Sequence, residues 1–72
     1  MKNLVSLVVV KVKTDHGSDN VRFLQYHDDV SGADEYKVIY EEENKEINVT
    51  KEQGNDLYRK IIKNAYCRLK VV

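Results

Sequence analysis

The fold is decided near the start of the chain, by residues 3–13, which read NLVSLVVVKVK. Branched apolar residues dominate this run, and such residues favour β-strand. The first half is apolar at nearly every position, whereas the second half alternates between valine and lysine from Val10 to Lys13. The pattern predicts a central strand that is covered on both faces near its start. The run is too short for a membrane span and lacks a small-residue cleavage pattern after it, so a signal peptide is the weaker interpretation.

Three further segments alternate with the period of two that is typical of a half-buried strand. They cover residues 21–27, 36–41 and 46–49. The segments between them are rich in Asp, Asn, Ser and Gly, which favour turns. The last two strands predict a hairpin. Because every connection is short, we expect the strands to pair antiparallel in a meander.

The hydrophobic period changes towards the C-terminus. From Leu57 to Leu69 the apolar residues are separated by gaps of three and four, as on one face of an α-helix. Thr50 is a suitable N-cap, and Gln53 stands at the position that completes a capping box. The sequence therefore predicts a helix over residues 51–70.

Together these elements predict an α+β fold in one domain, residues 1–72: a small antiparallel β-meander of three to four strands with one C-terminal amphipathic helix packed on one face. A chain of this size buries only about 60% of its unfolded surface. Its one cysteine, Cys67, excludes an intrachain disulfide and favours a cytoplasmic location. A homodimer is one route to extra burial. One helix covers one face, so tyrosines, lysine stems or a partner must cover the other.

Charge is strongly segregated along a chain whose net charge is zero. The first 13 residues carry three lysines and no acid, residues 14–49 carry ten acids against three bases, and residues 50–72 carry six bases against two acids. Separated signs steer association with charged partners. The distribution therefore indicates a binding protein, without identifying what it binds.

No arrangement of residues indicates catalysis or a cofactor. His16 and His27 stand in or beside turns that also carry aspartates, but their spacing matches no known metal-ligand pattern. Cys67 has no histidine near it in the sequence, and a lone thiol in a small domain is usually inert. The chain has no glycine-rich phosphate loop. We therefore expect a protein that is not an enzyme and holds no metal.

The acidic middle of the chain predicts a protein-binding surface. Its candidate residues are Asp28, Asp29, Asp34, Glu35, Tyr36, Tyr40, Glu42 and Glu43. Carboxylates arrayed along a sheet can occupy a basic groove meant for nucleic acid, and tyrosine buries area while keeping a polar tip. The hypothesis is a small protein-binding module, such as a phage or mobile-element inhibitor of a host nucleic-acid-processing or defence protein. In the plainer interpretation the acids serve solubility, and the two tyrosines lie beneath the helix.

The basic residues of the predicted helix support an alternative function. Arg59, Lys63 and Lys70 line one flank, and Tyr66 borders it. A basic face with an aromatic residue can meet phosphate and stack on bases. This hypothesis is a nucleic-acid-binding regulator, and its plainer counterpart is a solvated helix surface. Neither hypothesis involves a membrane.

Overall fold

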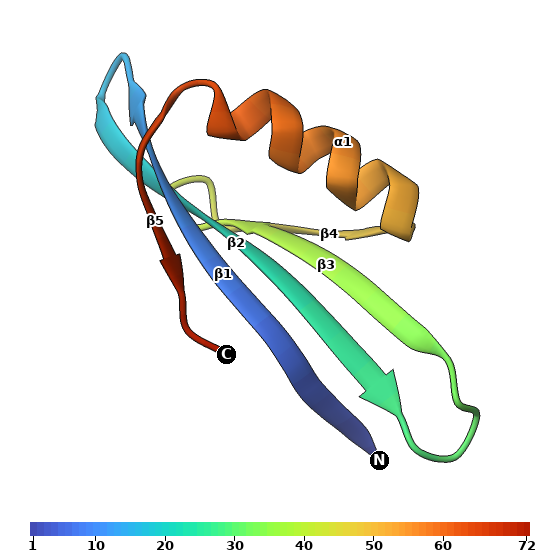
Figure 1. The fold of residues 1–72 in the computed structure, drawn as a ribbon. Coiled ribbons are helices and arrows are strands. Elements are labelled where there is room, and N and C mark those ends of the chain that lie inside the picture. Colours follow the sequence, from blue (N-terminus) through green and yellow to red (C-terminus); the bar gives the residue numbers. More distant parts are fainter.

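A computed structural model describes residues 1–72 and contains one antiparallel sheet with one helix across it (Figure 1). The elements are β1 (Lys2–Thr14), β2 (Gly17–Asp28), β3 (Asp34–Tyr40), β4 (Lys45–Val49), α1 (Lys51–Ile62) and β5 (Ala65–Lys70). The sheet has five strands in the order β4-β3-β2-β1-β5. The predicted α+β class is confirmed, and strands occur at all four predicted places. The expected number of three to four strands was too low.

The prediction was wrong about the end of the chain. The helix expected over residues 51–70 ends at Ile62, and the following residues form β5, which pairs antiparallel with β1. The segment fits both periods, because Ala65, Cys67 and Leu69 also alternate as a strand requires. Pairing with β1 accounts for the strand, because the backbone groups of this segment and of the β1 edge hydrogen-bond to each other there. Lys63 and Asn64 make the turn, in which the Asn64 amide donates to the Ile61 carbonyl at 3.1 Å.

The start of α1 follows the prediction. The Thr50 side chain accepts a hydrogen bond from the Gln53 amide at 3.1 Å, and the Gln53 side chain accepts one from the Thr50 amide at 3.0 Å. This capping box is confirmed. Gly54 lies in the first turns of the helix, where a Cβ would be in van der Waals contact with the Val49 side chain at 3.4 Å.

The first hairpin is tighter than the sequence indicated. Thr14 pairs with Gly17, so only Asp15 and His16 form the turn, and Gly17 adopts a φ of 125° that favours glycine. Residues expected to be turn therefore belong to β2. One of them, Asp19, is buried and accepts a hydrogen bond from the amide of Glu42 at 2.9 Å, which ties β2 to the turn after β3.

The core lies between the sheet and α1, and it is small. Only three apolar side chains are fully buried, namely Val10, Val21 and Val38. Phe23 on β2 meets Tyr58 on α1 edge to face, with ring centroids 5.3 Å apart, which identifies the helix-covered side of the sheet. No residue of α1 is fully buried. The other side of the sheet, called the open face below, has no helix on it (Figure 1).

The molecule is elongated, measuring 42 × 20 × 19 Å. The start of β1, the end of β2, the start of β3 and the turn between β2 and β3 project beyond α1 and β5 (Figure 1). We call this projection the arm and define it as residues 1–5 and 26–35. Neither α1 nor β5 covers the arm, so it adds little to the core.

Candidate protein-binding surface

The acidic residues that the sequence singled out fall into two groups. The arm carries Asp28, Asp29, Asp34 and Glu35, whereas Glu42 and Glu43 lie in the turn after β3. These turns are at opposite ends of β3, a strand of seven residues, which separates the groups by roughly 20 Å. The structure thus brings four of the six carboxylates together and leaves two apart.

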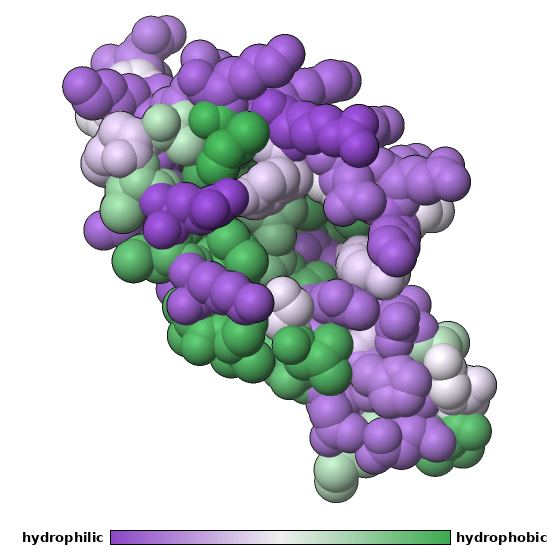
Figure 2. Space-filling model, in the orientation of Figure 1, coloured by the Kyte–Doolittle hydropathy of each residue, from purple (hydrophilic) through white to green (hydrophobic).

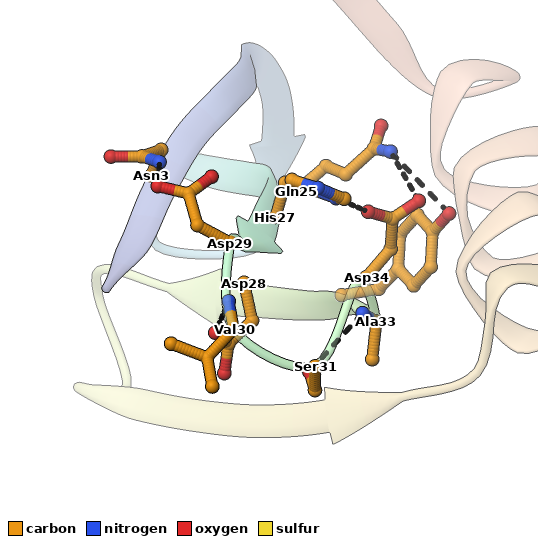
Figure 3. A network of polar contacts seen from close by, with 10 residues as sticks. Asn3, Gln25, His27, Asp28, Asp29, Val30, Ser31, Ala33 and Asp34 are labelled. Carbon is orange, nitrogen blue, oxygen red and sulfur yellow. Dashed lines mark hydrogen bonds and ion pairs between the residues drawn. The ribbon is translucent and has the colours of Figure 1, made fainter.

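The two tyrosines lie on the helix side of the sheet, and only Tyr36 is near an acid of the arm, because the Gln25 side chain donates to both Asp34 and the Tyr36 hydroxyl at 3.5 Å (Figure 3). Tyr36 pairs with Val49 of β4, and Tyr40 pairs with Val21 of β2, and both tyrosines are half-buried. Burial raises the pKa of Tyr40, and the negative charges of Glu43 and Asp19 add to the effect. This placement matches the interpretation in which both tyrosines lie beneath the helix.

Side chains, rather than a core, hold the tip of the arm (Figure 3). Asp28 accepts a hydrogen bond from the Val30 amide at 2.9 Å, and Ser31 accepts one from the Ala33 amide at 3.2 Å. The Asn3 amide group donates to Asp29 at 2.8 Å and so ties the turn to β1. Such side-chain bonds to nearby backbone amides are typical of turns that keep one conformation.

Ion pairs extend this network along the arm. His27 Nδ1 lies 2.7 Å from Asp34 Oδ1, and Lys2 Nζ lies 2.8 Å from Glu35 Oε2. The hydrogen bond to Asp34 raises the pKa of His27, because it favours the charged imidazolium. The Val30 amide lowers the pKa of Asp28 by stabilising its carboxylate.

The arm is therefore an ordered acidic projection. It has four carboxylates against one lysine, one histidine and the N-terminal amine, which lies 3.8 Å from Asp28. At its tip Val30 is 86% exposed. An apolar tip among carboxylates suits a basic partner surface with a small apolar depression.

The residues of the nucleic-acid hypothesis do not share one helix. Arg59 lies on α1, where its Nη1 is 3.6 Å from Asp56 Oδ1, and Lys63 follows the end of α1. Tyr66 and Lys70 belong to β5, where Tyr66 is 53% exposed. The basic side chains are thus divided between the helix and an edge strand.

Sequence reasoning missed a contact between those two elements. Arg68 on β5 donates a hydrogen bond to the Tyr58 hydroxyl on α1 at 2.7 Å. Arg68 pairs with Val10 and so points to the helix side of the sheet. No local signal marks this bond, because it exists only once residues 65–70 form a strand.

Groups for metal or covalent chemistry are not gathered anywhere. No three His, Cys, Asp or Glu side chains lie together as a metal site would need. Cys67 is half-buried on the open face, paired with Lys11. The single helix is neither long enough nor apolar enough to cross a membrane.

Comparison with protein-family models, with curated proteins and with solved structures gives no match.

Proposed function

We propose that the protein is a small non-catalytic protein-binding module whose arm contacts a basic surface of its partner. The observation that carries this proposal is the projection of an acidic, ordered arm beyond the helix and the last strand (Figure 1). The arm carries four carboxylates, and two of them, Asp28 and Asp29, directly precede the exposed Val30.

Energetics support a binding role for the arm. Ordering a residue costs roughly 1–2 kcal/mol of backbone entropy, and in the arm the backbone pairing of β1, β2 and β3 offsets this cost, because an exposed ion pair returns only about 0–1 kcal/mol. The arm's ion pairs are exposed, and its apolar side chains Leu4 and Val5 are 38% and 45% exposed. The arm therefore adds little stability for its length. Because the arm is already ordered in the free protein, it loses less conformational entropy when it binds a partner.

The charge of the arm defines the class of partner. Carboxylates held on a narrow projection attract a basic groove from a distance and speed association. Basic grooves are typical of proteins that bind nucleic acid. We therefore propose as the partner a host nucleic-acid-processing or defence protein, which a phage or mobile-element protein would inhibit by occupying its groove.

A matched pair of charge reversals tests this function. One variant carries Asp29→Lys and Glu35→Lys on the arm, and the control carries Glu42→Lys and Glu43→Lys at the other end of β3. Both change the net charge by the same amount. Tagged wild type and both variants are used to capture proteins from host lysate with and without nuclease treatment, with circular dichroism as a check on folding.

The proposal expects one protein that wild type and control retain and that the arm variant loses. Retention by both variants would contradict a role for the arm. Capture that disappears with nuclease would instead support the alternative, in which Arg59, Lys63, Tyr66 and Lys70 contact nucleic acid.

A further inference from the structure

The open face of the sheet carries apolar side chains where a solvated face should carry polar ones. Cross-strand pairing places Leu7 beside Leu24 and Val9 beside Leu69, and Leu4 continues the same face beyond the bulge in β1. We call these five residues the open patch. An antiparallel sheet with one wet face normally alternates apolar and polar residues, so this patch is out of place in water.

The patch lies at the β1 side of the sheet and is accessible. Leu4 is 38% and Leu69 is 50% exposed, and the C-terminal Val71 and Val72 beside Leu7 are 60% and 48% exposed. Figure 2 shows apolar side chains gathered along β1, β5 and the C-terminus. A contiguous apolar area of this kind indicates a contact surface.

Paired charges surround the patch on the β2–β3–β4 side. Three ion pairs lie on the open face: Lys2 with Glu35, Arg22 with Glu41, and Lys37 with Glu46. Lys37 also lies over the ring of Tyr26, 5.8 Å from its centroid. An apolar centre with a polar rim is the anatomy of a protein interface. Because this part of the rim is internally neutralised, it does not repel an identical surface.

The small core of the chain gives a reason to bury the open patch. Its core has only three fully buried apolar side chains, and its single cysteine gives it no internal disulfide. In chains of about 70–80 residues or fewer a single core rarely supplies more than about 3–5 kcal/mol, and a second subunit is one way in which small proteins bury more apolar surface. Whatever covers the patch must then be present whenever the chain folds, and a second copy of the chain meets that condition.

We propose that two copies pack their open faces together about a twofold axis, with the open patch of each at the centre. The sheets would stack about 10 Å apart, as in a β-sandwich. The molecule measures 42 × 20 Å along and across the sheet, so the whole open face has an area on the order of 800 Å². This is about the area that each partner buries in a standard interface. This self-association goes beyond the proposed function of the arm, with which it shares Leu4 and the Lys2–Glu35 ion pair.

Sedimentation equilibrium of the purified protein tests the proposal. The wild type is expected to sediment as two chains of 8.4 kDa each at micromolar concentration. Leu69→Glu puts a charge on the patch in both copies and is expected to raise the dissociation constant at least about 100-fold. Asn55→Glu is the matched control, because Asn55 is exposed on α1, which covers the other side of the sheet, and it should leave the dimer intact.

A second measurement needs no variant. In a dimer made from isotope-labelled and unlabelled chains, intermolecular nuclear Overhauser effects are expected between the methyl groups of Val9, Leu24 and Leu69. A wild type that stays monomeric at 100 micromolar or more would overturn the proposal. Intermolecular effects that arise only from α1 or β4 would overturn it as well, because the contact would then lie elsewhere.

Discussion

Removing two methyl groups from the centre of the small core tests the fold most sensitively. Val10 is fully buried (0% exposed), between the sheet and α1. Val10→Ala loses about 0.8 kcal/mol for each deleted methyl group, and the cavity adds about 24 cal/mol per Å³. We expect the free energy of unfolding to fall by about 2–3 kcal/mol. A chain of 72 residues has a total of roughly 4–11 kcal/mol, so this single change removes a large part of it.

Val30→Ala is the control, because it deletes the same atoms from a side chain that is 86% exposed. Its unfolding free energy should stay within about 0.5 kcal/mol of wild type. The assay is urea unfolding followed by circular dichroism at one protein concentration, since association would make stability depend on concentration. The reasoning is refuted if Val10→Ala costs less than about 1 kcal/mol, or if both variants cost the same.

Three smaller perturbations test the helix cap, the arm and the last strand. Thr50→Ala removes the side-chain acceptor of the capping box and should cost about 1 kcal/mol in urea unfolding, whereas Thr50→Ser should cost much less. Asp34→Asn removes the charged partner of His27, so the pKa of His27 in an NMR titration should fall towards 6.5. That pKa is raised in the folded protein, so the His27–Asp34 pair contributes its full stabilisation below pH 6.5 and loses it as the pH rises through the folded pKa. A His27 pKa that does not change in the Asp34→Asn variant would show that Asp34 is not the cause of the shift. Tyr58→Phe removes the acceptor of the Arg68 hydrogen bond, costs about 0.5–1.5 kcal/mol and should speed amide exchange in β5 more than in β3.

Local signals predicted much of the fold. The alternation after Val8 identified β1, and Thr50 with Gln53 identified the start of α1. The end of the helix was missed because Leu69 fits both a helical and a strand period and no glycine or proline stops the helix before it. The strand conformation of residues 65–70 goes with their pairing to β1, some 50 residues away in the chain, and a local pattern does not contain that information.

The grouping of the acidic residues was predictable from the sequence, as the positions of most strands were. The acids from Asp28 to Glu35 flank a single turn, so their proximity follows from the sequence. Their separation from Glu42 and Glu43 follows from the meander, because successive turns lie at opposite ends of the strands. The sequence indicated that the face without the helix needs cover, but the residues of the open patch were not predictable, since they depend on which face of the sheet α1 covers and on the pairing of Leu69 with Val9.

We propose that the arm makes the contact with the partner. The most direct test is the association rate of the captured partner with wild type, with the Asp29→Lys, Glu35→Lys variant and with the Glu42→Lys, Glu43→Lys variant at low ionic strength. Reversal on the arm should slow association at least about tenfold, because steering by charge acts on the approach. Reversal at the other end should change the rate much less. Equal rates for the two variants would contradict the claim.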